Sequence, residues 1–234
     1  MARRCTPPVT SRFAVARVPV RGDTGGVSAE MLVARARRVG VQDERVLEAL
    51  RAVDRAAFVP AEHRDLAVRD QPVPLPEGQT TSQPSLIARM IEALDLQGHE
   101  RVLEVGSGYG YQTALLAALA REVVSIERIP ALVQAARANL ASLISVTVLD
   151  GDGSLGAPEH APYDAIVVSA AFPDVPSPLI EQLAEGGRLV QPVGPGGREE
   201  VIVFTRDEQG FRALGRLVGA RFVRLYGEHG FPAG

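Results

Sequence analysis

The stretch Glu104-Val105-Gly106-Ser107-Gly108-Tyr109-Gly110 decides the fold expected for this chain of 234 residues. It follows an apolar run, 101–105, that predicts a buried strand, and it precedes an alanine-rich run, 111–120, that predicts a helix. Glycines at such a turn let the backbone approach a ligand closely, and the helix start presents N–H groups without partners. The turn therefore indicates a nucleotide site, although dinucleotide dehydrogenases use a related turn.

Strand and helix patterns alternate beyond this turn. Strands are expected over 122–127, 145–150, 164–170 and 187–193, and helices over 131–142 and 177–184. Strands separated by crossover segments of this length predict an α/β fold with a parallel sheet. Three further strands, 201–206, 212–218 and 221–226, are joined by short turns and predict an antiparallel addition at one edge.

The segment before the glycine turn has a different pattern. A helix is expected from Val27, with an apolar face formed by Met31, Leu32, Ala36, Val39 and Val41. A second helix follows an Asp43 cap, residues 61–80 contain three prolines and predict an extended loop, and a third helix is expected over 85–96. We expect one domain over 27–234, divided into a helical, substrate-side part (27–97) and a cofactor-binding sheet (98–234).

Composition excludes several classes of protein. The chain has a single cysteine and a formal net charge of −3, and all 25 basic residues are arginines. A disulfide framework, a cysteine-based zinc site, a Walker A loop and a Schiff-base enzyme are thereby excluded. No apolar run reaches the roughly 20 residues that span a bilayer. We expect a cytoplasmic monomer that binds neither nucleic acid nor membrane.

The first 22 residues carry five arginines and no acidic residue. We expect a disordered basic leader over residues 1–26, and the composition also fits a transit peptide.

Acidic residues stand at the ends of three successive predicted strands. Glu104 lies just before the glycines, Glu127 lies 19 positions after Gly108, and Asp152-Gly153 follows the third strand. A carboxylate at the position of Glu127 can accept both ribose hydroxyls, and ligands gather at the carboxyl ends of such strands. Glu104 suits a cationic amino group better than a pyrophosphate. The pattern therefore favours S-adenosyl-L-methionine over NAD.

A second distinctive segment is Gly78-Gln79-Thr80-Thr81-Ser82-Gln83-Pro84, whose hydroxyls precede a helix start. With this segment, the chain from about residue 27 to residue 226 resembles the protein-L-isoaspartate O-methyltransferases. Further matching segments, in family order, are Phe58-Val59-Pro60, Val102-Leu103-Glu104-Val105-Gly106-Ser107-Gly108, Gly110-Tyr111-Gln112, Gly151-Asp152-Gly153, Gln182-Leu183, Gly186-Gly187-Arg188-Leu189, Pro192-Val193-Gly194 and Arg221-Phe222-Val223.

The resemblance implies a class I methyltransferase fold, a Rossmann-like sheet with helical and loop additions over the substrate site. The family uses S-adenosyl-L-methionine to methylate the free carboxylate of L-isoaspartyl or D-aspartyl residues in damaged proteins and peptides. The ester then closes to a succinimide, whose hydrolysis returns some normal aspartate. By position, Ser82 corresponds to the family's active-site serine, with Thr80 and Thr81 beside it. The residues expected at the cofactor are Glu104, Gly106, Ser107, Gly108, Glu127, Arg128, Asp152 and Gly153.

The chemistry fits the absence of histidine and cysteine beside these motifs. A carboxylate nucleophile has a pKa of about 4 and needs no general base at neutral pH. We expect Ser82 and the N–H groups at the start of the following helix to orient it.

Two departures from the family pattern leave other substrates open. Arg224 and Tyr226 stand where the family commonly continues with Pro-Leu-Thr. An alternative function is methylation of a normal aspartate to form an aspartimide in a natural-product precursor. A catalytically silent binder of S-adenosylmethionine or of isoaspartyl tails is a weaker alternative, because Ser82 and the glycine loop are both present. A small-molecule methyltransferase is also disfavoured, because the Thr-Thr-Ser-Gln-Pro loop would have no purpose in it.

Overall fold

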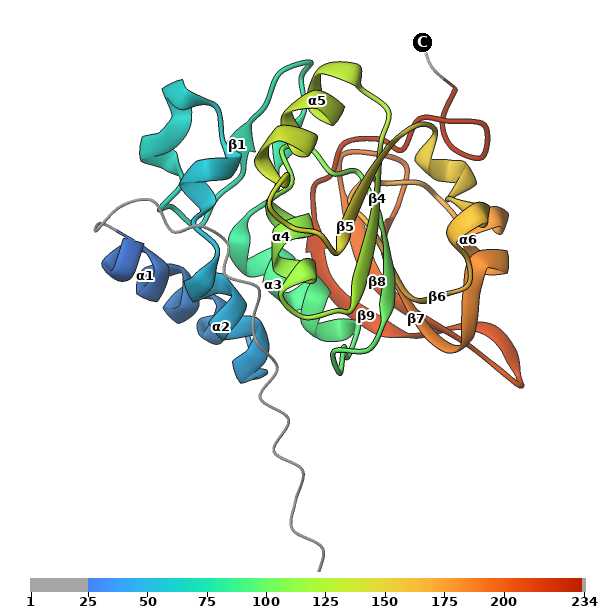
Figure 1. The fold of residues 1–234 in the computed structure, drawn as a ribbon. Helices are drawn as coiled ribbons and strands as arrows, with labels where there is room; N and C mark the ends of the chain where they lie inside the picture. The colour runs from blue at the N-terminus through green and yellow to red at the C-terminus, as the bar shows by residue number, and fades with distance from the viewer. Residues whose placement is uncertain (1–24, 233–234) are drawn as a thin grey trace, which may run out of the picture.

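A computed structural model describes residues 25–232. A seven-stranded sheet in the order β5-β4-β3-β6-β7-β8-β9 forms its centre (Figure 1). The strands are β3 (Arg101–Val105), β4 (Glu122–Glu127), β5 (Val146–Asp150), β6 (Tyr163–Val168), β7 (Leu183–Val193), β8 (Glu199–Asp207) and β9 (Gly210–Ala220). Strands β3 to β7 pair in parallel, whereas β8 and β9 pair antiparallel at one edge. The predicted α/β class and its antiparallel edge are confirmed.

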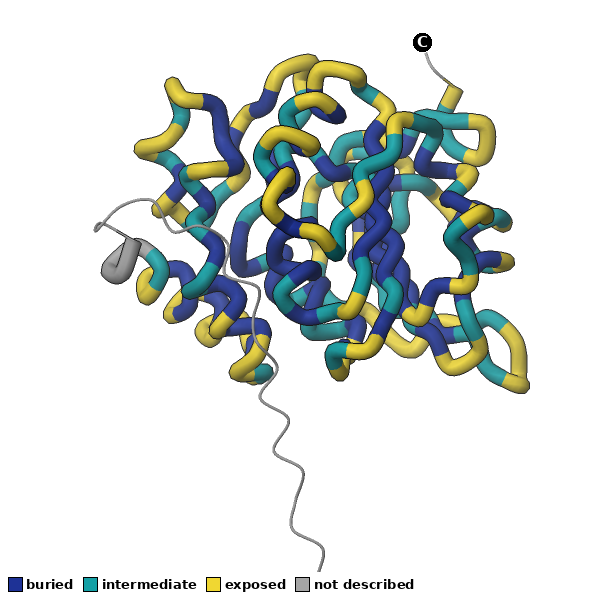
Figure 2. The backbone as a smooth tube through the Cα atoms, in the orientation of Figure 1, coloured by how far each residue is buried: buried dark blue, intermediate teal, exposed yellow. Residues whose placement is uncertain are grey.

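Alternate residues of the central strands face opposite sides of the sheet. On β3, Val102 packs into one core and Leu103 and Val105 pack into the other. Both cores consist of aliphatic side chains, so the central strands are buried along most of their length (Figure 2). Glu104 falls on the same face as Val102, and its side chain is fully buried. An acidic side chain therefore lies inside a packed face of the sheet, next to the glycine turn that follows β3.

Helices cover both faces of the sheet (Figure 1). Their bounds are α1 (Gly25–Arg38), α2 (Glu44–Ala52), α3 (Pro84–Ala93), α4 (Tyr111–Ala117), α5 (Pro130–Asn139) and α6 (Ser177–Gln182). Buried residues of α1 to α5 share one core, whereas α6 packs on the other face. The Asp43 side chain accepts the N–H of Arg45, so the predicted cap of α2 is confirmed.

The expected inner face of α1 is partly wrong. Met31 and Val39 are 53% and 39% exposed, whereas Leu32, Ala36 and Val41 are buried. Leu32 and Ala36 face α2 and α3, against which α1 packs. Met31 precedes Leu32 by one residue, a rotation of about 100° around the helix, and therefore faces solvent.

The prediction of an extended loop over 61–80 is also wrong. Residues Ala61–Leu66 form a 3-10 helix, and strands β1 (Val73–Pro74) and β2 (Thr80–Thr81) form a short antiparallel hairpin. The prolines start or flank these elements instead of preventing them. The hairpin fixes the threonines that precede Ser82.

The segment 221–226, expected as a strand, runs as an irregular chain instead. Its backbone bonds to the loop around Ala171, beyond the carboxyl end of β6, and the N–H of Phe222 donates to the Glu199 carboxylate at the start of β8. The N–H of Leu225 donates to the Ala171 carbonyl, and the N–H of Ala171 donates to the Val223 carbonyl. The segment therefore crosses the edge where the strands end rather than extending the sheet.

The basic leader expected over 1–26 lies outside the described residues, except that Gly25 and Gly26 begin α1. Within residues 25–232, no helix combines the length and apolar character that a membrane crossing requires.

Candidate active site

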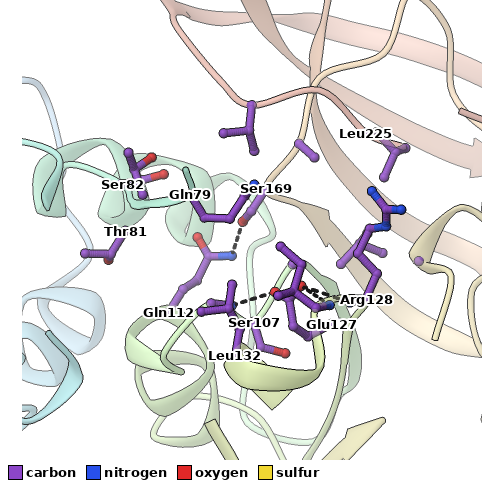
Figure 3. A pocket seen from close by; sticks show the side chains of 18 of the residues that line it. Gln79, Thr81, Ser82, Ser107, Gln112, Glu127, Arg128, Leu132, Ser169 and Leu225 are labelled. Atoms are coloured by element: carbon purple, nitrogen blue, oxygen red, sulfur yellow. Dashed lines mark hydrogen bonds between the residues drawn. The ribbon is translucent and has the colours of Figure 1, made fainter. Parts of the chain in front are cut away.

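One pocket brings together most of the residues singled out in the sequence. It is lined by Gln79, Thr80, Thr81 and Ser82 of the 78–84 loop, Gly106, Ser107 and Gly108 of the glycine turn, Glu127, Arg128 and Gly153 at the following strand ends, and Val223, Arg224, Leu225 and Tyr226. Thr81 and Ser82 lie on one side of it and Glu127 and Arg128 on the other, with Gln112 and Ser169 between them (Figure 3). Two chemically different halves therefore face a common space.

The glycine turn requires backbone conformations that favour glycine. Gly106, Gly108 and Gly110 have φ values of +95°, +55° and +92°. A side chain at Gly110 would also place a Cβ 2.7 Å from Leu140 Cδ1. These constraints explain why the glycines stand at these three positions.

Glu127 organises the turn from the end of β4. One carboxylate oxygen accepts the N–H of Gly108 at 3.0 Å, and the other accepts the N–H groups of Arg128 and Ile129 at 2.9 and 3.0 Å. Each carboxylate oxygen has two lone-pair directions, so the oxygen that accepts only Gly108 keeps one direction free for a hydroxyl donor from the pocket. The expected location of Glu127 beside a ligand's hydroxyls is thus geometrically possible.

Glu104 does not line the pocket. Its side chain is fully buried, and one oxygen accepts the hydroxyls of Thr113 and Ser125. The other oxygen, Oε1, has no hydrogen-bond partner among the described residues. Burial raises the pKa of Glu104 to about 7, against the smaller opposing effect of these hydroxyls.

Hydroxyl contacts nevertheless connect Glu104 with the pocket. Ser125 also contacts the hydroxyl of Ser107, which lines the pocket. Any influence of Glu104 on a ligand is therefore indirect, through this chain of hydroxyls and through its charge.

Asp152 also stands outside the pocket lining, whereas Gly153 contributes to it. The Asp152 carboxylate accepts the N–H and hydroxyl of Ser154 and the N–H of Glu228. Burial raises the pKa of Asp152, but these hydrogen bonds and nearby Arg128 outweigh it and hold that pKa below its usual value. Its carboxylate thus ties the C-terminal segment to the end of β5.

The start of α3, which follows the hydroxyl loop, does not offer the free N–H groups that the sequence suggested. Pro84 has no N–H, and the N–H of Ser85 donates to Asp70 at 2.9 Å. The N–H groups of Leu86 and Ile87 are directed to the Gln83 carbonyl. The expected set of free N–H groups at the start of α3 is therefore largely occupied within the protein.

Two further lining residues were not singled out as site residues in the sequence. Ser169 directly follows β6, and its hydroxyl accepts the side-chain amide of Gln112 at 3.0 Å (Figure 3). Gln79 reaches the pocket from the loop before β2. A polar residue just after a parallel strand is a usable signal for Ser169, whereas nothing local distinguishes Gln79.

Comparisons with known proteins identify the family. The family model described as protein-L-isoaspartate(D-aspartate) O-methyltransferase matches residues 27–230. The chain belongs to this family. A relative from Methanoculleus marisnigri, named protein-L-isoaspartate O-methyltransferase, is 48% identical over 204 residues, which cover 86% of this chain and 92% of the relative.

Solved structures of methyltransferases share the fold. A protein-L-isoaspartate O-methyltransferase is 28% identical with a TM-score of 0.75, covering 86% of this chain and 66% of that one. A structure described as a Plasmodium falciparum protein-L-isoaspartate O-methyltransferase in complex with S-adenosyl-L-homocysteine has a TM-score of 0.73 at 24% identity, covering 85% and 98%. The predicted class I methyltransferase fold is confirmed.

Proposed function

We propose that this protein transfers a methyl group from S-adenosyl-L-methionine to the free carboxylate of L-isoaspartyl and D-aspartyl residues in damaged proteins and peptides. Membership of the protein-L-isoaspartate O-methyltransferase family supports this function. The observation that carries it is the shared pocket, in which the hydroxyl loop around Ser82 faces the glycine turn and Glu127.

The residues of the sheet edge fit the methyl donor. The close backbone approach at Gly106 and Gly108 and the spare lone-pair direction of Glu127 suit an adenosine whose ribose donates a hydroxyl to that carboxylate. Burial holds the pKa of Glu104 at about 7, so this carboxyl is partly protonated near neutral pH. In its ionised form it adds negative charge on the side where a cationic donor would lie. When bound, the donor supplies an electrophilic methyl group on a positively charged sulfur.

The hydroxyl loop would receive the substrate carboxylate. An oxygen of this ionised group forms the new bond to the methyl carbon while the carbon–sulfur bond breaks, and no proton needs to be removed. Ser82, with Thr80 and Thr81 beside it, orients the carboxylate by hydrogen bonding. Alignment of the reacting atoms alone can contribute about 7–11 kcal/mol to such a transfer. The ester product then closes to the succinimide without further help from these residues.

A paired-peptide assay tests this function. An isoaspartyl peptide and its aspartyl twin are incubated with methyl-labelled S-adenosyl-L-methionine, and label in base-labile ester is counted. We expect label in the isoaspartyl peptide alone. Equal labelling of the aspartyl twin would contradict repair and support aspartimide formation, and label in neither peptide would contradict the proposed reaction.

The composition of the chain is the basis for its expected location, oligomeric state and partners. We infer a cytoplasmic monomer that acts on proteins and peptides and binds neither nucleic acid nor membrane. Light scattering at several protein concentrations tests the monomer, because a dimer would show twice the chain mass of 24.9 kDa.

A further inference from the structure

Arg55 is a buried cation behind the hydroxyl loop. Only 2% of it is exposed, and its guanidinium donates to four backbone carbonyls rather than to a carboxylate. These are the carbonyls of Ala67 and Arg69, at 3.4 and 2.9 Å, and those of Gln71 and Ser82, at 2.9 and 3.1 Å. One side chain thus holds the turn at residues 67–71 against the residue expected to orient the substrate.

The charge of Arg55 has no ion-pair partner in the described part of the chain. The guanidinium lies over the ring of Tyr111, 5.7 Å from the centroid, and its Nε has no hydrogen-bond acceptor. The nearby Asp70 carboxylate is committed to Gln83 and Ser85. Burial lowers the pKa of Arg55, more than Tyr111 and Asp70 raise it. An unpaired buried charge is unfavourable, so an incoming anion nearby would relieve it.

The hydrogen bond to the Ser82 carbonyl places the guanidinium charge beside the Ser82–Gln83 peptide unit. The Ser82 carbonyl and the Gln83 N–H belong to the same trans peptide bond, so the N–H points away from the guanidinium. No described protein group accepts the Gln83 N–H, unlike the N–H groups of Ser85, Leu86 and Ile87. Donation from a cation to the carbonyl polarises the peptide and strengthens its N–H as a donor.

We propose that Arg55 is a positioning residue that polarises the Ser82–Gln83 peptide, so that the Gln83 N–H and the Ser82 hydroxyl together receive the substrate carboxylate. This inference rests on the proposed function. It assigns Arg55 a part in recognising the negative charge of the acceptor, although neither Arg55 nor Gln83 lines the pocket of the glycine turn. Gln83 lines an adjoining hollow that shares Thr80 and Ser82 with that pocket, so the acceptor carboxylate would lie where the two meet. A cation behind the peptide favours a carboxylate over a neutral amide of the same shape.

The test compares binding of two peptides in the presence of S-adenosyl-L-homocysteine. One peptide carries isoaspartate, and the other carries the neutral isoasparagine at the same position. Calorimetry gives the ratio of their dissociation constants, and we expect the wild-type protein to prefer isoaspartate at least tenfold. Arg55→Met should reduce this preference at least fivefold. Arg55→Lys keeps the charge but loses the planar guanidinium that binds several carbonyls at once. It should bind both peptides more weakly than the wild type and retain more of the preference for isoaspartate than Arg55→Met does.

A second arginine that binds backbone carbonyls, although it is exposed, serves as the control for general stabilisation. Arg45 also donates to two backbone carbonyls, those of Leu96 and Leu119, but away from the pocket. Arg45→Met should destabilise the protein without changing the peptide preference. If Arg55→Met leaves the preference unchanged, or weakens both peptides by the same factor, the proposal is overturned.

A backbone substitution tests the same inference if Arg55→Met does not fold. Gln83 has φ −57° and ψ 129°, which proline adopts readily, so Gln83→Pro removes the N–H with little change of the chain. Its comparison is Gln83→Ala, which loses the same side-chain contacts but keeps the N–H. We expect Gln83→Pro to lose at least fivefold more of the preference than Gln83→Ala, and equal losses would refute the proposal. Turnover of the isoaspartyl peptide by the wild type separates these outcomes from failure of the proposed function.

Discussion

Replacing Glu104 with glutamine should stabilise the free protein increasingly as pH rises. The folded protein holds the pKa of this carboxyl at about 7, against its ordinary value of 4.5, because burial disfavours its charged form. Between these two values the unfolded chain has already lost the proton, whereas the folded protein still binds it. The stability contributed by the protonated group is therefore complete below pH 4.5 and is lost as pH rises through 7.

The size of the effect follows from the same two values. One pKa unit corresponds to about 1.4 kcal/mol, so the stability difference between Glu104→Gln and wild type should grow by about 2 kcal/mol from pH 5.5 to pH 8. Urea unfolding of both proteins at both pH values, without ligand, measures this difference. Taking the difference cancels the titration of all groups that the two proteins share.

A second buried glutamate provides the control. Burial raises the pKa of Glu100, but backbone N–H groups, including those of Gln97 and Gly98, outweigh it and hold the pKa below its usual value. Glu100→Gln should therefore show no gain in relative stability between pH 5.5 and pH 8. A Glu104→Gln difference that is the same at both pH values would refute the assignment of a raised pKa to Glu104.

Three further substitutions probe the pocket. Ser82→Ala should lower kcat about 10- to 100-fold, the effect of one hydrogen bond to a charged group, while the affinity for S-adenosyl-L-methionine stays within a few-fold; an unchanged kcat with an isoaspartyl peptide would contradict its role. Glu127→Gln should raise the dissociation constant of S-adenosyl-L-homocysteine, measured by calorimetry, at least tenfold, because two acceptor oxygens become one. An unchanged dissociation constant would exclude Glu127 from the ribose site. Gly153→Ala would place a Cβ 2.4 Å from Val105 Cγ1 and should lower the free energy of unfolding by about 1–3 kcal/mol in urea titrations, whereas wild-type stability would show that β3 yields.

The central sheet could be predicted closely because its signals are local. Strands β3 and β4 have the predicted bounds, since each is a short apolar run ended by a glycine turn or a charged residue. The segment 221–226 also contains apolar residues, but it forms only isolated bridges, Arg224 with Ala171 and Tyr226 with Phe231, and adds no strand to the sheet. Strand pairing depends on tertiary position, which composition alone does not contain.

Most of the residues singled out in the sequence do line the pocket, but the sequence did not show how deeply each side chain is buried. Glu104 and Glu127 both end or nearly end strands in the sequence, yet only Glu127 reaches the pocket. The two-residue period places Glu104 beside Val102 on a packed face, and the hydroxyl of Thr113 that receives it comes from α4. Arg55 was not recognised, because its partners are backbone carbonyls 12 to 27 residues away and leave no pattern of residue types.

Glu104 and Arg55 are two buried ionisable groups without ionic partners among the described residues, and their charges, once Glu104 is ionised, are opposite in sign to those of the two reactants. Glu104 lies beneath the half of the pocket that fits a cationic methyl donor, and Arg55 lies behind the half expected to hold an anionic acceptor. Methyl transfer converts this cation and anion into a neutral thioether and a neutral ester, so both charges weaken on the way to the transition state. Fixed charges that attract the reactants more strongly than the transition state favour binding and do not by themselves raise kcat. Glu104 and Arg55 should therefore act mainly on the affinities for donor and acceptor, while alignment at Ser82 acts on the chemical step. The same loss of charge weakens the hold on both products and so favours their release.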